Sequence, residues 1–188
     1  MKIFFLLILV VFIPLIQSSA GLNAQVYGIQ RYWSVLDSSR NGSATDANGL
    51  IGIKFTDDFK RLIYNVNLNN IANITGIYLY NKGDNQTIIL DLLKEAKEAK
   101  VKDKFRDTSN LLASANEVEG TVAVGGVTSD DMRGVLSGKS LKDLYGLVND
   151  EELYVVVTTK EYPRGEIFGN EFIPTERFFP DTTDFDWS

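Results

Sequence analysis

Hydrophobic positions along this chain mostly recur with a period of two, which is the pattern of a β-strand with one buried face. The clearest segment is 62–68 (LIYNVNL), in which Leu62, Tyr64, Val66 and Leu68 alternate with mostly polar residues. Successive side chains of a strand point to opposite faces of the sheet, so these four are expected in a core. Turn residues separate further segments of strand character. The predicted strands are 26–37, 49–55, 61–68, 74–80, 87–92, 118–127, 153–159 and 166–172.

Three segments depart from this period and predict short helices. Residues 93–100 (LKEAKEAK) are strong helix formers. Residues 128–131 (TSDD) and the segment that opens at Ser140 each begin with a hydroxyl residue suited to cap a helix. In the helix expected to open at Ser140, the residues expected to face inward are Leu141, Leu144 and either Leu147 or Val148. Many short strands with few helices predict an all-β fold, an antiparallel Greek-key-like β-sandwich with one or two short helices inserted.

The two ends of the chain are expected to lie outside this domain, which we place at residues 25–173. Lys2, an apolar run over 4–16 and the small residues before Ala20 predict a signal peptide over residues 1–20. Cleavage after Ala24 is a second possibility, and an uncleaved anchor is a third, although the run is short for a membrane span. Cleavage would leave no membrane span and a secreted, extracellular or cell-surface protein.

The tail of residues 174–188 mixes four aromatic residues with four acids. Such a segment either pairs with the sheet edge of a neighbouring subunit or remains a loosely held terminus, and the pattern favours neither. Residues 174–188 are therefore treated as an acidic aromatic C-terminal tail.

Charge and composition exclude several classes of function. The net charge of -6 argues against a nucleic-acid partner, which would require a basic face. The chain has no cysteine, so an exported domain of this sequence folds without disulfides. It also has no histidine, and zinc or copper sites need imidazole or thiolate.

Calcium is the one cofactor that the sequence leaves open, because it binds carboxylate and carbonyl oxygens. The acidic candidates are Asp57 with Asp58, Asp130 with Asp131, and Asp181, Asp184 and Asp186. None has the spacing of an EF-hand loop, and turn, helix-cap and tail usage explains them more simply. We therefore predict no cofactor.

Enzymatic chemistry is not predicted either. A hydrolase of the serine type needs a general base, and the chain has neither histidine nor a Gly-x-Ser-x-Gly elbow. Glu161 and Glu166 flank Pro163 and could in principle form the carboxylate pair of a glycosidase. Pairing of these acids with Lys160 or Arg164 is the favoured alternative.

Three Asn-x-Ser/Thr sequons begin at Asn41, Asn73 and Asn85. Asn41 and Asn85 lie in predicted loops, which suits N-glycosylation of an exported protein. Asn73 lies in a strand pattern, where sheet architecture is the alternative explanation.

The segment 153–169 (LYVVVTTKEYPRGEIFG) reads as a β-branched strand, a proline turn and a second strand. Pro163 restricts φ, and Gly165 allows a backbone angle that other residues resist. Glu166 then opens the last strand, where it can bond across the turn to backbone or to an arginine, and Gly169 ends the motif. These residues are expected to define the fold rather than to bind a ligand.

This segment resembles the closing motif of the CHRD (chordin-type) domain family. Segments 48–55, 62–76, 126–131 and 141–147 are similar to other parts of the family pattern, in the same order. The resemblance implies an extracellular β-domain. Where the family usually has histidines, this chain has Tyr78, Tyr80 and Thr158. Phenol ionises near pH ~10 and does not replace imidazole as a metal ligand at neutral pH, so the histidine chemistry is not inherited.

The leading hypothesis is a secreted, non-enzymatic binding or cell-surface interaction module, with an extracellular protein or glycan as partner. The alternative is a structural surface protein that self-associates through edge strands and the C-terminal tail. A superoxide-dismutase-like metalloenzyme is disfavoured by the missing histidines.

Overall fold

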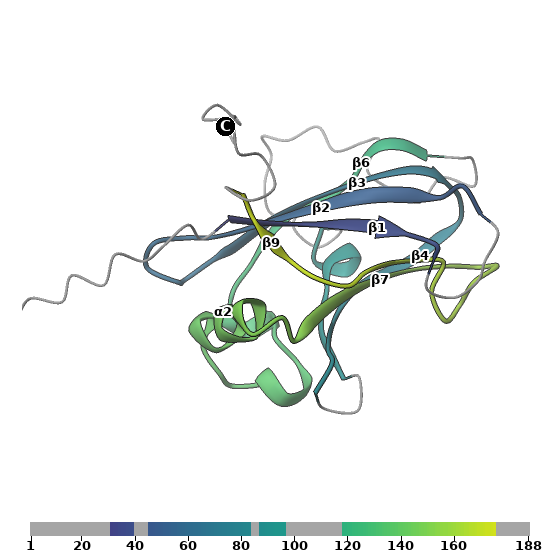
Figure 1. Cartoon of the computed structure of the whole chain (residues 1–188). Coiled ribbons are helices and arrows are strands. Elements are labelled where there is room, and N and C mark those ends of the chain that lie inside the picture. Colours follow the sequence, from purple (N-terminus) through teal and green to yellow (C-terminus); the bar gives the residue numbers. More distant parts are fainter. Residues whose placement is uncertain (1–30, 40–44, 84–86, 97–117, 176–188) are drawn as a thin grey trace, which may run out of the picture.

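The computed structural model describes residues 31–39, 45–83, 87–96 and 118–175 (Figure 1). Within these residues every strand pairing is antiparallel, which confirms the predicted all-β fold. The strands are β1 (Arg31–Asp37), β2 (Asn48–Phe55), β3 (Leu62–Ile71), β4 (Ile74–Asn81), β5 (Ile88–Asp91), β6 (Val118–Val127), β7 (Leu153–Thr159), β8 (Ile167–Gly169) and β9 (Ile173–Pro174).

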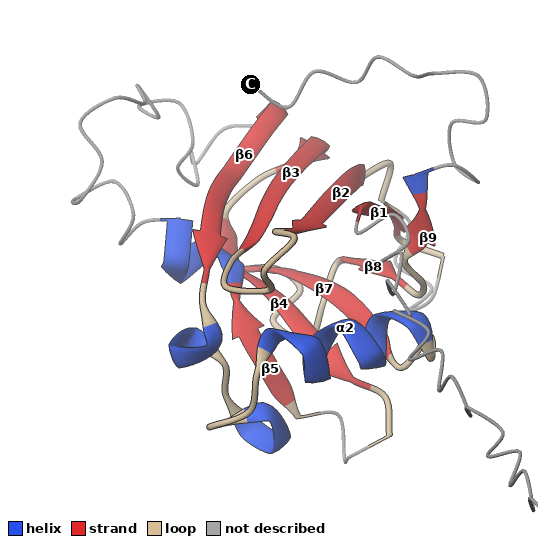
Figure 2. Cartoon of the chain, turned by 90° about the vertical axis from the view of Figure 1, so that its left-hand side faces the viewer, coloured by secondary structure: helices blue, strands red, loops and turns tan. Residues whose placement is uncertain are grey.

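The strands form one sheet that curls on itself into a sandwich-like arrangement. Their order is β5-β4-β7-β8-β1-β2-β3-β6, and β9 pairs with β1. Only the pair Asp37–Phe168 joins β1 to β8 among the described residues, and the sheet turns there. Figure 2 shows the result, in which β5, β4 and β7 form one layer and β1, β2, β3 and β6 form the other.

The core lies between these two layers. The four residues singled out in β3, namely Leu62, Tyr64, Val66 and Leu68, are fully buried, as the alternating pattern predicts. Ile77 of β4 and Val157 of β7 are equally buried in the other layer. The Tyr64 hydroxyl donates a 2.8 Å hydrogen bond to the Leu92 carbonyl. Burial raises the pKa of Tyr64, with Glu95 adding to the effect, so this phenol stays protonated and keeps its donor.

Strand β7 is buried on both of its faces. Its inner residues Val155 and Val157 belong to the core, whereas Tyr154 and Val156 lie on the outer face. Phe168 of β8 lies across from Val156 and packs over it. This double burial explains why the segment reads as a continuous apolar run rather than as an alternating strand.

The helices cover the open side of the core. Residues 92–96 are helical, and the rest of the helix predicted over 93–100 lies outside the described residues. Two short 3-10 helices, η1 (Ser129–Asp131) and η2 (Gly134–Leu136), precede helix α2 (Leu141–Asn149). The inward positions of α2 are Leu141, Leu144 and Val148, so the choice between Leu147 and Val148 falls on Val148. The ring of Tyr145 on α2 packs edge-on against Tyr32, Phe55 and Phe59 at 5.2–6.2 Å.

Within the described residues, two strand boundaries differ from the predicted ones by more than one residue. The strand expected over 166–172 ends at Gly169, and the chain then crosses to pair Ile173 and Pro174 with β1. The turn expected at 69–72 falls later, because β3 continues to Ile71 through a register shift and Asn73 adopts a positive φ of 52°. Asparagine tolerates that conformation better than most residues, which is why the turn forms there.

The predicted signal peptide and residues 176–188 of the predicted tail lie outside the described residues. Among the residues that the structure describes, no helix is both long and apolar enough to span a membrane.

Candidate functional site

The closing motif forms a tight turn between β7 and β8. The Gly165 amide donates to the Tyr162 carbonyl at 3.0 Å, which places Pro163 second in a four-residue turn, where its fixed φ fits. Gly165 has a φ of 121°, which favours glycine, and a methyl group there would collide with the Phe168 ring. Pro163 and Gly165 therefore meet the backbone requirements of this turn.

Glu166 is held beneath this turn by a neighbouring hydroxyl. Its Oε2 accepts a 2.7 Å hydrogen bond from Thr159 Oγ1, and the same hydroxyl accepts from the Tyr162 amide at 3.1 Å. Glu166 is only 7% exposed. The sequence predicted a partner in the backbone or in a basic side chain, and the Thr159 hydroxyl is one partner of this carboxylate.

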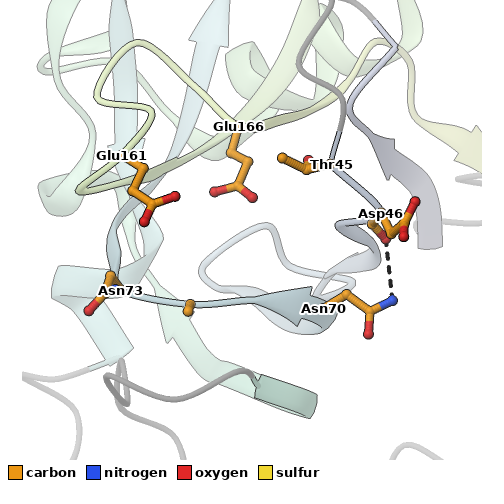
Figure 3. A pocket seen from close by; sticks show the side chains of 7 residues that line it. Thr45, Asp46, Asn70, Asn73, Glu161 and Glu166 are labelled. Atoms are coloured by element: carbon orange, nitrogen blue, oxygen red, sulfur yellow. Dashed lines mark hydrogen bonds between the residues drawn. The ribbon is translucent and has the colours of Figure 1, made fainter.

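A polar pocket of about 400 Å³ opens beside the turn (Figure 3). It brings together residues from the segment before β2, from the end of β3 with the β3–β4 turn, and from the β7–β8 turn. The lining residues are Thr45, Asp46, Asn70, Ala72, Asn73, Glu161 and Glu166. The Asn70 amide donates to the Asp46 carbonyl at 3.4 Å.

Glu161 and Glu166, the pair considered for glycosidase chemistry, therefore do line one pocket. The two side chains differ in environment, because Glu161 is exposed and Glu166 is buried against Thr159. A buried carboxylate that accepts a hydroxyl bond within its own hairpin fits a structural role. The pocket is thus a polar recess beside the β7–β8 turn.

The glycosylation candidates fall in different regions. Asn73 lines the polar pocket at the β3–β4 turn, where its carbonyl accepts a 3.1 Å hydrogen bond from the Lys160 amide. Asn41 and Asn85 lie outside the described residues. N-glycosylation at these three positions stays a prediction.

The acidic pairs considered for calcium serve local turns. Asp58 accepts from the Thr56 hydroxyl at 2.7 Å and from the Lys60 amide at 3.0 Å, and these hydrogen bonds lower its pKa. Asp131 accepts from the Thr128 amide at 2.7 Å, as a helix-capping residue does. No group of three or more acidic residues able to hold a metal occurs in the described part of the chain, and Asp181, Asp184 and Asp186 lie outside it.

Tyr78, Tyr80 and Thr158, which stand where the resemblance implies histidines, lie on one face of the sheet. Gly76, Tyr78 and Tyr80 of β4 pair across the strands with Thr158, Val156 and Tyr154 of β7. Because residues two apart share a face, Tyr78, Tyr80 and Thr158 all point to the outer side of this layer. The structure therefore brings these positions together, away from the core.

The tyrosines form an ordered group of rings. Tyr80 stacks on Tyr154 with centroids 5.2 Å apart and an interplanar angle of 19°. Tyr78 meets Tyr80 edge-on at 6.1 Å and 69°. Thr158 is buried, and its hydroxyl lies 2.9 Å from that of Thr75.

Sequence reasoning missed the neighbours that complete this face. Tyr154 and Phe168 lie in the closing motif. Tyr154 is two residues from Val156 in β7, and Phe168 of β8 lies directly across from Val156, so both lie on the same side of the sheet as Val156. Asp91 of β5 pairs with Tyr78. The alternation within each strand indicates a shared face, but only the strand order shows which residues become neighbours.

Both of these partly exposed phenols, Tyr78 and Tyr80, stay protonated at neutral pH. Burial is the main cause that raises the pKa of Tyr78, and Asp91 adds to it. Burial is also the largest cause that raises the pKa of Tyr80, followed by electrostatic interaction with Tyr154 and Tyr78. A protonated phenol donates and accepts hydrogen bonds, so these positions can recognise a polar partner without metal chemistry.

Comparison with known proteins gives one match. A family model described as the CHRD domain matches residues 33–170. No curated protein and no solved structure matches the chain.

Proposed function

This chain belongs to the CHRD domain family, and we propose that it is a secreted, non-enzymatic module that binds a partner outside the cell. The family is of the extracellular binding type, and its domains occur in extracellular proteins. The predicted signal peptide supports export of this member.

The outer face of β4, β7 and β8 is the surface that carries this proposal. Tyr78, Tyr80 and Phe168 are partly exposed there, and Tyr154 and Val156 lie buried beneath them. Tyrosine combines a large apolar ring with a polar hydroxyl, and it is enriched where proteins meet their partners. A surface of this composition supports binding.

The composition of the chain supports a role without catalysis. Without histidine or cysteine, the chain lacks the residues that most often act as general base and as thiol nucleophile. Glu166, the buried acid of the polar pocket, is engaged by the Thr159 hydroxyl within its own hairpin. These features favour recognition over chemistry.

The test is attachment of the purified mature protein to intact cells of its source or to their extracellular matrix. We expect saturable attachment by the wild type. The affinity of attachment should fall at least about tenfold in the double variant Tyr78→Ala/Tyr80→Ala, because two contact rings are removed. Ile63→Ala is the control, because Ile63 is partly exposed on β3 in the opposite layer. Attachment that is absent, or that both variants leave unchanged, would contradict the proposal.

Self-association is a second candidate, favoured by the edge strand β6. Among the described residues, β6 (Val118–Val127) pairs only with β3, which leaves one side of a ten-residue strand without a strand partner. Such an edge can add a strand from another chain. Light scattering after size exclusion tests this: a concentration-dependent oligomer that Val124→Lys dissociates supports assembly, and a wild-type monomer contradicts it.

A further inference from the structure

Asn73 lies in the turn that leads from β3 to β4. β3 ends at Ile71 and β4 begins at Ile74, so only Ala72 and Asn73 carry the chain from one layer to the other. Asn73 has a φ of 52°, a conformation that asparagine, aspartate and glycine accept more readily than other residues do. The structure thus places this sequon asparagine in a turn rather than inside a strand.

The side-chain amide of Asn73 reaches solvent. It makes no hydrogen bond within the described part of the chain, although the backbone carbonyl of Asn73 accepts one from the Lys160 amide. Neither of its polar atoms is among the buried atoms that lack a partner there. A polar group that is neither bonded nor buried is accessible to water. Figure 3 shows this side chain at the outer end of the polar pocket, directed away from Glu161 and Glu166.

Other asparagines of this fold use their side chains to support turns. The Asn70 amide donates to the Asp46 carbonyl at 3.4 Å, and the Asn81 side-chain oxygen accepts from the Gly83 amide at 2.8 Å. Asn70 is the closest comparison, because its φ of 54° matches that of Asn73 while it begins no sequon. The backbone at position 73 accounts for a residue that tolerates positive φ, but the carboxamide of Asn73 has no part in the turn.

The surface around Asn73 has room for a bulky hydrophilic group. Asn70 and Thr75 are exposed on either side of the turn, and Lys160 and Glu161 of the neighbouring β7–β8 turn are exposed as well. An N-linked glycan is large and solvated, so its acceptor must lie at the surface of the folded protein. Thr75 also supplies the hydroxyl residue that completes the sequon.

We propose that Asn73 carries an N-linked glycan in the exported protein. The donor is an oligosaccharide joined through a diphosphate to a lipid. The amide nitrogen of Asn73 forms a bond to C1 of the first sugar and loses a proton, and the bond from C1 to the diphosphate breaks. The lipid diphosphate is the leaving group, so the step needs no oxidant or reductant. This inference rests on the secretion that is part of the proposed function, and it assigns a modification site to the secreted chain.

The experiment is peptide mapping of the full chain, expressed in a eukaryotic secretory host and collected from the medium. Trypsin cuts after Arg61 and Lys82, so the peptide 62–82 contains Asn73 as its only sequon, and Asn41 and Asn85 fall in other peptides. Enzymatic release of an N-glycan leaves aspartate in place of the glycosylated asparagine. We expect mass spectrometry to find the peptide 62–82 with aspartate at position 73 after release, and not in the untreated digest.

Two variants make the result specific. Asn73→Asp keeps the size of the side chain and the tolerance of a positive φ but removes the acceptor amide, so the intact protein should lose the mass of one glycan. Asn70→Asp is the matched control, because Asn70 has the same backbone conformation near the same turn and begins no sequon. It is expected to keep the glycan. Circular dichroism of both secreted variants establishes that they are folded.

Two outcomes would overturn the inference. In the first, the peptide with aspartate at position 73 is equally abundant with and without glycan release. In the second, Asn73→Asp carries as many glycans as Asn70→Asp. The fate of the wild-type protein separates this inference from the proposed function: secretion with an unmodified Asn73 contradicts the glycan alone, whereas retention inside the cell with residues 1–20 still attached contradicts secretion and the glycan together.

Discussion

Glu166 and Thr159 share a 2.7 Å hydrogen bond beneath the closing turn, and both side chains are buried. Thr159 ends β7 and Glu166 precedes β8, so the bond ties the two strands together at the base of the hairpin. The buried carboxylate depends on donors of this kind, because an unsatisfied charge in the interior is costly.

Replacing Thr159 with valine should therefore destabilise the fold. The change keeps the shape of the side chain but removes the donor to a buried carboxylate. We expect the free energy of unfolding to fall by about 1–3 kcal/mol, measured by urea denaturation. Thr121→Val is the matched control, because its hydroxyl bonds Asn67 at an exposed position, and it should change stability by less than about 0.5 kcal/mol. Equal losses of unfolding free energy in the two variants would show that the buried Thr159–Glu166 bond stabilises the fold no more than the exposed Thr121–Asn67 bond does.

Gly76→Ala should displace the ring of Tyr78. A methyl group at Gly76 occupies the space of that ring, and the ring can swing outward because it is partly exposed. We expect loss of the nuclear Overhauser contacts between the Tyr78 and Tyr80 rings, with a destabilisation of about 1 kcal/mol as the packing over Gly76 is lost. Ring contacts that survive in Gly76→Ala would contradict the placement of Tyr78.

Gly146 on α2 provides the opposite case. Nothing lies within 4 Å of a methyl group built at Gly146, and its backbone is helical. Gly146→Ala is expected to stabilise the protein by about 0.5–1 kcal/mol, because alanine favours the helix. The pair of glycine variants thus predicts opposite signs in the same melting experiment.

The start of α2 should make stability depend on pH. Hydrogen bonds from the Ser140 hydroxyl and amide lower the pKa of Asp143 below 3.8, so the folded state favours its ionised form. This contribution is fully present above the unfolded pKa and is lost as the pH falls through the lowered folded value. Ser140→Ala is expected to be less stable than the wild type by about 0.5–2 kcal/mol at neutral pH.

The difference between wild type and Ser140→Ala should shrink between pH ~5 and pH ~2, as Asp143 becomes protonated in both proteins. Thermal melts across this range measure it. A difference that stays constant to pH ~2 would show that the carboxylate of Asp143 does not contribute through its charge.

Tyr64→Phe should weaken the link between β3 and the helical turn at Leu92. The hydroxyl donates a 2.8 Å bond to the Leu92 carbonyl in the core, and its loss is expected to cost about 0.5–1.5 kcal/mol in urea denaturation. Tyr78→Phe is the matched control at a partly exposed phenol and should leave stability within about 0.5 kcal/mol. Equal stability of the two variants would contradict the role of the buried bond.

Much of the secondary structure could be predicted from local patterns. Alternation in 62–68 identified the buried face of β3, and the segment 153–159 coincides with β7. The boundary of β8 was misplaced because a short strand followed by a crossover looks like one longer strand in the sequence. The candidate site was harder to predict, because its residues come from separate strands.

The sequence by itself determined the all-β class, the family and the absence of imidazole and thiolate chemistry. Local periodicity and composition carry the fold class and the missing chemistry, since each strand's pattern reflects whether its own faces are buried. The family rests on the resemblance of ordered motifs and on the matching family model. Only the tertiary structure decided that Tyr78, Tyr80 and Tyr154 form one platform and that Asp46, Asn73 and Glu161 line one pocket. Periodicity indicates which face a side chain takes, whereas the neighbours on that face depend on strand order and register, which long-range packing selects.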